Sequence, residues 1–246
     1  MGLLSCRSPL ALILIVITIT FGFSIHPVQA TVITNGCANS NSCTLVELAG
    51  GGTFIVDDKL FDDWWVDDFS SNAPLDLGSI NVTALDDQPL NPGLRFDANG
   101  EFSIVGLDVV DITIGYSVST LDGSARIKDN SLELTGYTFG TGNVGGFIEI
   151  YEDVFDIAGN LIGEKFVTAD DFNLPPVFFN LFDSATFPAK SQIVTETTIF
   201  LSGDDPQDTV SLDSYEQRFS QVQIPEPGIL LLLTLGLAGL GLTRKR

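Results

Sequence analysis

The sequence predicts an all-β protein whose body is a single antiparallel β-sandwich or jelly roll. Short apolar stretches recur along the chain at regular spacing, and Gly, Pro, Asn and Asp residues separate them. No amphipathic helix longer than about two turns competes with these stretches. Apolar and aromatic residues are spread throughout, with 18 phenylalanines in 246 residues. The chain can therefore build a folded core and is not expected to be disordered.

Residues 1–30 have the organisation of a secretory signal peptide. One charge, Arg7, precedes an uncharged apolar run from Leu10 to Phe23, and small residues around Ala30 follow it as a cleavage site. We expect the Sec machinery to export the chain and signal peptidase to cut after Ala30. The alternative is a retained transmembrane anchor, for which this run is short.

Residues 31–52 are expected to form a short lead closed by a disulfide. Cys37 and Cys43 are the two cysteines that follow the signal peptide, and such a pair in an exported protein indicates a disulfide. Closing so short a loop stabilises the fold by roughly 2 kcal/mol in the chain-entropy model. Thr44 and Glu47 have the spacing of a capping box, which predicts a short helical turn.

Residues 53–224 form the predicted β-sandwich body, and Asp111–Ser119 is its clearest strand. Ile112, Ile114, Tyr116 and Val118 alternate there with small or polar residues. This period of two is the pattern of a half-buried strand, so the four side chains are expected to face the core.

Turn residues predict two hairpins within the body. Asp122 and Gly123 would join Asp111–Ser119 to a returning strand, and a turn at residues 158–160 would join a second pair. No composition shift or repeat divides the body, so one domain is expected. The other predicted strands are Thr53–Val56, Ser79–Leu85, Ala125–Lys128, Ser131–Phe139, Phe147–Phe155, Leu161–Thr168, Val177–Phe182, Ser191–Leu201 and, as a last pair with a bend near Asp213 and Ser214, Val210–Val222.

The body is strongly acidic. Between residues 31 and 224 it has 7 basic against 31 acidic residues, which gives a formal charge of −24. Such a surface repels nucleic acid and anionic membranes, so no nucleic-acid partner is expected. It suits solubility, divalent cations or a hydrated polysaccharide environment.

The mature body lacks histidine, because the single histidine, His26, lies in the signal peptide. This absence excludes Ser-His-Asp and Cys-His catalysis and zinc sites that contain histidine. Two carboxylates could still hydrolyse a glycosidic bond, but no acid–base motif stands out among so many acidic residues. We therefore predict a protein without enzymatic activity and keep a carboxylate-dependent glycoside hydrolase as the least favoured alternative.

Three acidic pairs, five residues apart, form the most unusual local pattern of the body. A hard cation such as calcium could screen six neighbouring carboxylates, although the spacing does not match an EF-hand loop. A solvated acidic loop, with no cofactor, is the plainer interpretation. The residues of this candidate calcium site are Asp57, Asp58, Asp62, Asp63, Asp67 and Asp68.

Trp64 and Trp65 lie within this acidic segment and are the only tryptophans. Adjacent residues of a strand face opposite sides, so one tryptophan could pack in the core while the other stacks on a sugar. The alternative is that both serve packing. A carbohydrate-binding module is thus a second hypothesis for the body, by analogy with other β-sandwiches.

The chain ends in a segment, residues 225–246, that does not resemble a globular core. Pro225, Glu226 and Pro227 open it, and the prolines keep this triplet out of the last strand because they lack backbone donors. The uncharged run from Gly228 to Leu242 follows, and we predict a transmembrane helix over residues 228–243. As a helix, the fifteen residues of the uncharged run span about 22 Å, whereas the hydrocarbon core of a membrane is roughly 30 Å thick. This helix would make a marginal permanent anchor and an adequate temporary one.

A basic stop, Arg244, Lys245 and Arg246, closes the tail and is expected to stay in the cytoplasm. A cleaved signal peptide at the other end then places the body outside. The alternatives for this tail are an ordinary C-terminal anchor and a glycolipid-anchor signal, which would lack the basic end.

The order of a Pro-Glu-Pro triplet, an apolar run and a basic stop resembles the PEP-CTERM sorting signal of exported bacterial proteins. The resemblance implies recognition by an exosortase-type membrane protease, with the triplet as the sorting motif. Pieces of the body, such as Gly51 to Phe54 and Asn91 to Phe96, are similar to β-rich bodies of other exported proteins with this tail, for which no activity is assigned. The family association with exopolysaccharide-producing bacteria implies extracellular polysaccharide as a partner.

These observations predict an exported, non-catalytic surface or extracellular-matrix protein. It would be anchored transiently in the inner membrane by its tail, and its mature body would lie at the cell surface or outside the cell. The alternative is an extracellular module that binds carbohydrate or calcium.

Overall fold

A computed structural model describes residues 32–71, 74–88, 90–121, 123, 125–140, 145–171 and 179–224 of the chain. The predicted signal peptide with Ala30, the sorting triplet, the transmembrane helix and the basic stop all lie outside these residues. No helix in the described part is long and apolar enough to cross a membrane.

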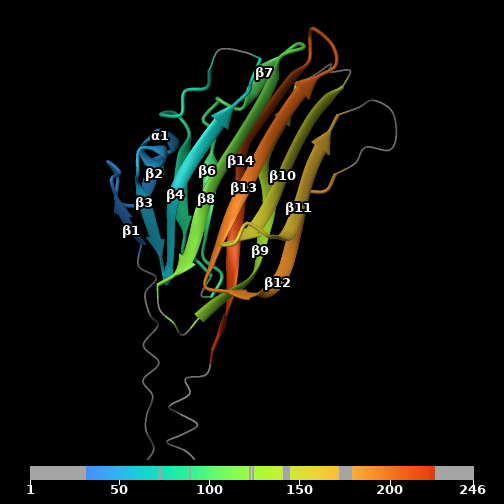
Figure 1. The fold of residues 1–246 in the computed structure, drawn as a ribbon. Coiled ribbons are helices and arrows are strands. Elements are labelled where there is room, and N and C mark those ends of the chain that lie inside the picture. Colours follow the sequence, from blue (N-terminus) through green and yellow to red (C-terminus); the bar gives the residue numbers. More distant parts are fainter. Residues whose placement is uncertain are drawn as a thin grey trace, which may run out of the picture.

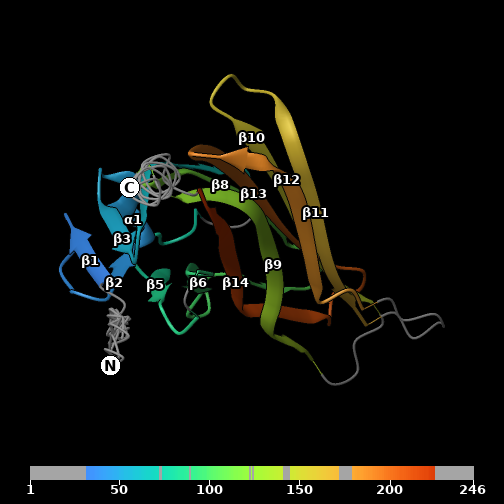
Figure 2. The ribbon, with the colours of Figure 1, turned by 90° about the horizontal axis from the view of Figure 1, so that it is seen from below.

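The described chain forms two antiparallel β-sheets that face each other, which confirms the predicted all-β sandwich (Figures 1 and 2). We name them sheet 1 and sheet 2. In their spatial order, the strands of sheet 1 are β1 (Val32–Asn35), β3 (Thr53–Val56), β4 (Lys59–Asp68), β8 (Val109–Thr120), β13 (Gln192–Gly203), β10 (Gly146–Asp156) and β11 (Leu161–Asp170). Those of sheet 2 are β12 (Phe182–Lys190), β9 (Ala125–Phe139), β14 (Thr209–Gln223), β6 (Gly93–Asp97), β5 (Asn81–Leu85) and β2 (Ser42–Thr44), with β7 (Ser103–Val105) paired to β14.

The strand periodicity seen in the sequence determines which side chains fill the space between the sheets. Ile112, Ile114, Tyr116 and Val118 of β8 are all fully buried, as predicted. An aromatic cluster joins the two sheets. Trp64 stacks on Tyr116 with ring centroids 4.2 Å apart, and Phe96 stacks on Tyr215 at 4.5 Å. These contacts place the centre of the apolar core between β4, β8, β6 and β14.

The N-terminal lead is part of the sandwich. Its strand β1 pairs with β3 at the edge of sheet 1, and β2 pairs with β5 at the edge of sheet 2. Cys37 and Cys43 form the expected disulfide. The capping box is also present, since Thr44 and Glu47 exchange hydrogen bonds at the start of α1 (Leu45–Ala49).

One predicted hairpin is confirmed and the other is wrong. Strands β10 and β11 pair as expected around the turn at residues 156–160. Strands β8 and β9, however, belong to different sheets, because β8 pairs along its length with β4 and β13. The turn residues near Gly123 therefore connect the two sheets.

Three boundaries also differ from the prediction. Residues 125–139 form the one strand β9, and residues 209–223 form the one strand β14, whose register shifts between Leu212 and Tyr215 absorb the expected bend. The predicted strand Val177–Phe182 falls partly outside the described residues. Strand β12 begins only at Phe182.

Part of the interior between the described strands is polar, which the apolar pattern does not explain. Glu152 and Lys165 lie between the sheets, and their side chains are fully buried. Asn130, Thr197 and Gln217 lie beside them and are fully buried too. We name these five residues the buried polar cluster. Burial of an ion pair is costly unless the remaining donors and acceptors of the pair are hydrogen-bonded.

Candidate functional site

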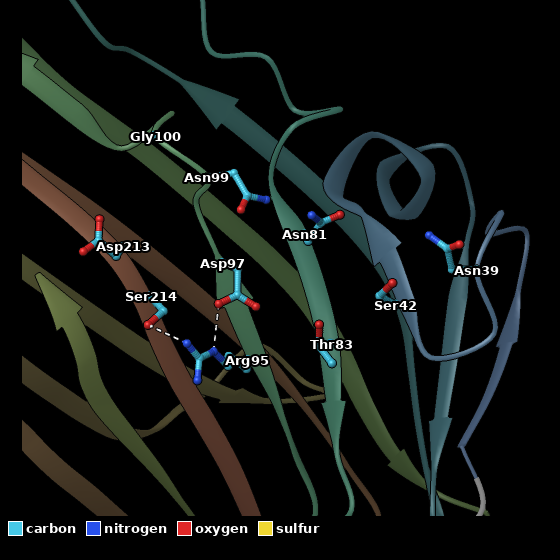
Figure 3. A pocket seen from close by; sticks show the side chains of 10 residues that line it. All are labelled: Asn39, Ser42, Asn81, Thr83, Arg95, Asp97, Asn99, Gly100, Asp213 and Ser214. Carbon is cyan, nitrogen blue, oxygen red and sulfur yellow. Dashed lines mark hydrogen bonds and ion pairs between the residues drawn. The ribbon is translucent and has the colours of Figure 1, made fainter.

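A polar hollow of about 500 Å³ opens on the outer face of sheet 2 (Figure 3). Strand alternation builds it. On β6, Leu94 and Phe96 are buried in the core, which turns Arg95 and Asp97 to the opposite face. The residues that line the hollow are Asn39, Ser42, Asn81, Thr83, Arg95, Asp97, Asn99, Gly100, Asp213 and Ser214.

The register of the strands brings these residues together although they are far apart in the sequence. Asn81 of β5 lies opposite Asp97 of β6, and Asp97 lies opposite Ser214 of β14. In a neighbouring row, Ser42 of β2 lies opposite Thr83 of β5. Directly opposite residues share a face of the sheet, so these rows form one continuous polar surface.

Arg95 is held at the centre of this surface by its neighbours. Its Nε donates to Asp97 Oδ1 at 2.8 Å, and its Nη2 donates to Ser214 Oγ at 3.2 Å. Glu216 lies 3.9 Å from Nη1. The Arg95 side chain is still 42% exposed, so the oriented guanidinium retains donors for a ligand.

Charge and chemistry limit what this hollow can bind. It combines one guanidinium, the carboxylates of Asp97 and Asp213, and several amides and hydroxyls. The lining therefore presents donors and acceptors side by side, and none of the described residues that form it is aromatic. Such a surface suits a neutral ligand with many hydroxyl groups, because each hydroxyl both donates and accepts a hydrogen bond.

The acidic segment predicted as a calcium site is distributed over a turn and a strand. Asp57 and Asp58 lie in the turn before β4, and the other four aspartates lie on β4. Within the described ranges, no three acidic, cysteine or histidine side chains are gathered so that they could hold a metal ion. Calcium binding therefore remains a prediction without an assembled site.

Individual aspartates of this segment have structural surroundings. Lys59 is buried and lies 3.1 Å from Asp58. Asp68 accepts backbone hydrogen bonds from Ser70 and Leu75, both at 3.0 Å. Burial, together with the nearby charge of Asp63, raises the pKa of Asp62.

The two tryptophans face opposite sides of sheet 1. Trp64 is 7% exposed and stacks in the core. Trp65 is half-buried on the outer face, where it covers Gly115 of β8: a Cβ at position 115 would lie 2.1 Å from its Cε2 atom. The indole of Trp65 therefore packs against β8 with one face. Trp64 has no exposed ring face on which a sugar could stack.

A second hollow of about 340 Å³ lies near the end of β11, and three of the six described residues that line it are phenylalanines. Phe147, Phe166 and Phe179 surround Thr168 and Asn180 there. Two of its three polar side chains donate to backbone carbonyls, Thr168 to Ile148 and Asn180 to Phe166. The third is the side chain of Asp170, which is itself largely buried. The phenylalanine rings therefore make this recess more apolar than the polar hollow.

Sequence reasoning did not identify the polar hollow. Its residues come from four strands and two loops, and no short motif connects them. The available signal was the alternation around Asn81-Val82-Thr83 and Arg95-Phe96-Asp97. Any half-exposed strand shows that pattern, so it could not single out a site.

The comparison with protein families matches residues 223–246 to the PEP-CTERM protein-sorting motif. This match confirms the sorting signal predicted from the tail. A protein-sorting motif of this kind implies an exported protein that transits the membrane. The search of curated proteins found no match.

Several solved structures show distant likeness to the described fold. The carbohydrate-binding module TmCBM61, in complex with β-1,4-galactotriose, is 12% identical over 66% of this chain and 89% of its own, with a TM-score of 0.28. The mannan-recognising module TmCBM27 is 10% identical over 66% and 90%, with a TM-score of 0.30. The family 11 xylanase from Neocallimastix patriciarum is 7% identical over 79% and 100%, with a TM-score of 0.28. Likenesses this distant transfer no function to the present chain.

Proposed function

We propose that this chain is an exported, non-catalytic surface or extracellular-matrix protein whose tail is processed by an exosortase. The sorting motif at residues 223–246 carries this proposal. Strand β14 ends at Gln223, and Ile224 is exposed beyond it. In the sequence, the triplet Pro225-Glu226-Pro227 follows this exposed residue directly, so cleavage at the tail would leave every described strand intact.

The proposed route uses both ends of the chain. The Sec machinery exports the chain, signal peptidase removes residues 1–30, and the tail holds the body briefly at the inner membrane. Exosortase then acts at the tail, and the acidic body is released or attached to extracellular polysaccharide. The body's formal charge of −24 suits a hydrated environment of this kind.

Replacing Pro225 and Pro227 by alanine is expected to leave the protein in the membrane fraction. The triplet would lose its rigid geometry while the apolar run still inserts. Fractionation and immunoblotting of cells that express the full chain measure this outcome. Pro188→Ala changes an exposed proline of β12 and serves as the control, which should be released normally. Release of the doubly substituted protein at the control's level would contradict recognition of the triplet.

A second proposal is that the body binds a hydroxyl-rich carbohydrate in the polar hollow. The oriented, partly exposed guanidinium of Arg95 supports it, together with the amides and hydroxyls arranged around it. This second role is compatible with the first, since a surface protein that binds polysaccharide needs no catalytic group.

Arg95→Ala is expected to weaken binding of the matching glycan by about tenfold or more, because hydrogen bonds to a charged group are worth roughly 1.5–3 kcal/mol. A glycan array identifies the ligand, and titration calorimetry measures affinity. Arg126→Ala is the matched control, since Arg126 lies on β9 outside the hollow. Equal affinity of both variants for the glycan would show that the polar hollow is not the binding site.

The same samples also test the calcium-binding and glycoside-hydrolase alternatives. Loss of binding on chelation would favour the calcium-binding hypothesis. Release of reducing ends from a bound glycan would favour the hydrolase.

A further inference from the structure

The buried polar cluster brings together three groups of complementary reactivity. Glu152 of β10 and Lys165 of β11 lie directly opposite each other in sheet 1. Asn130 of β9 reaches them from sheet 2. All three side chains are buried, and Ile150, Val154 and Val167, fully buried neighbours along the same strands, flank them.

The distances place an amine, a carboxamide and a carboxylate in mutual contact. Lys165 Nζ lies 2.6 Å from Asn130 Oδ1 and 2.9 Å from Glu152 Oε1. Asn130 Nδ2 lies 2.6 Å from the same Glu152 Oε1. One carboxylate oxygen therefore touches both the amine and the amide nitrogen.

The rest of the cluster fixes the orientation of this carboxylate. Gln217 Nε2 donates to Glu152 Oε2 at 2.6 Å and to Thr197 Oγ1 at 2.7 Å. The hydroxyl of Tyr116 donates to Gln217 Oε1. Glu152 is thus held by Gln217 on one oxygen, and its other oxygen stays between Lys165 and Asn130.

Burial favours the reactive form of the amine. It lowers the pKa of Lys165, although the nearby carboxylate of Glu152 acts in the opposite direction. In a water-poor interior, transfer of a proton from the ammonium to the carboxylate costs less than in water, and hydrolysis cannot compete.

We propose that Lys165 and Asn130 form an intramolecular isopeptide bond, with Glu152 as the catalytic residue that moves the proton. This modification is independent of tail sorting and of carbohydrate binding. It needs no external reagent, because every reacting group is already within the sandwich.

The reaction balances within these three residues. Glu152 takes a proton from the Lys165 ammonium, and the freed lone pair of Nζ attacks Asn130 Cγ. The new C–N bond gives a tetrahedral intermediate, whose oxygen carries the displaced electron pair. Glu152 passes protons from Nζ to Nδ2, the carbonyl reforms, the Cγ–Nδ2 bond breaks, and one molecule of ammonia leaves. The products are the amide between Lys165 and Asn130, ammonia and protonated Glu152. The carboxylate is regenerated when the ammonia takes this last proton and leaves the site as ammonium.

The proposed bond would join the two sheets covalently, from β11 in sheet 1 to β9 in sheet 2. It closes the chain between positions 130 and 165, which are 35 residues apart. Heat or denaturant could then separate the two sheets only in part, because this segment would remain closed in the unfolded chain.

Mass spectrometry of the folded full chain tests the proposal after digestion with a protease that cleaves after glutamate. Glu133 and Glu149 separate the two partners in the sequence, so a bond yields a branched peptide that contains both Asn130 and Lys165. Its mass should be lower than the sum of the two linear peptides by one ammonia. Folded protein that gives only the two linear peptides would overturn the proposal, as would ammonia loss confined to a linear Asn130 peptide, which indicates a succinimide.

Glu152→Gln tests the role of the carboxylate, because it keeps the size and hydrogen-bonding capacity of the side chain but removes the proton acceptor. Its rate of bond formation should fall by about 10²–10⁴-fold. Lys165→Arg keeps a cation and should give no branched peptide. Near-ultraviolet circular dichroism shows whether each variant is folded. A folded Glu152→Gln variant that links at the wild-type rate would remove Glu152 as the catalytic residue.

Discussion

Replacing Lys165 by methionine is expected to lower the free energy of unfolding by about 3–5 kcal/mol, because it leaves Glu152 as a buried charge without its cationic partner. The ion pair is 2.9 Å long and both side chains are fully buried. Urea unfolding followed by tryptophan fluorescence measures the change. This range applies to protein in which Lys165 is still a free cation. In protein that carries the proposed isopeptide bond the substitution also removes the crosslink and the loss is greater, so mass spectrometry records the linkage of the same sample.

Lys128→Met is the matched control for this substitution. Lys128 lies 3.4 Å from Asp129, and its side chain is 47% exposed. An exposed pair of this kind contributes at most about 1 kcal/mol. Replacing Glu152 by leucine as well as Lys165 by methionine should recover part of the loss, since the uncompensated charge is then removed. Equal destabilisation by Lys165→Met and Lys128→Met would contradict the stabilising role of the buried pair.

Gly93→Ala is expected to lower the free energy of unfolding by about 3 kcal/mol or more, which is the upper end of the range for overpacked sites. A Cβ at this position would lie 2.1 Å from the carbonyl oxygen of Gln217 and 2.9 Å from Cα of Arg218. Both atoms belong to the backbone of β14, so no side-chain rotation can relieve the contact. The pairing of β6 with β14 must shift, and Arg95 in the polar hollow moves with β6.

Gly123→Ala provides the comparison for the glycine substitution. Nothing lies within 4 Å of a Cβ at position 123, so its effect should stay within about 0.5 kcal/mol. Thermal unfolding of the two variants measures the difference. Similar melting temperatures for both would show that the β6–β14 contact tolerates a methyl group.

Local patterns in the sequence predicted much of the fold. The period of two in β8 correctly assigned its buried face, and Thr44 with Glu47 marked the start of α1. The sorting tail was also readable, because its three pieces are contiguous. These features depend on neighbouring residues alone.

Long-range pairing could not be predicted in the same way. The turn signal at Asp122-Gly123 fits a hairpin and a connection between sheets equally well, and only the partners β4 and β13 decide where β8 lies. The polar hollow likewise depends on the register among β2, β5, β6 and β14.

The buried polar cluster could have been recognised in part from the sequence. Glu152 has the same parity along its strand as the buried Ile150 and Val154, and Lys165 has the same parity as Val167. A charge at a core position is unusual. Its partner Asn130, however, lies on the opposite sheet, and only the packing of the two sheets brings it within reach.

Separation of the exported body from its sorting tail can be read from the C-terminal peptide. We expect mass spectrometry of protein recovered at the cell surface and in the medium to give a mature C-terminus without the basic stop Arg244-Lys245-Arg246. A surface or secreted product that still ends at Arg246 would contradict it.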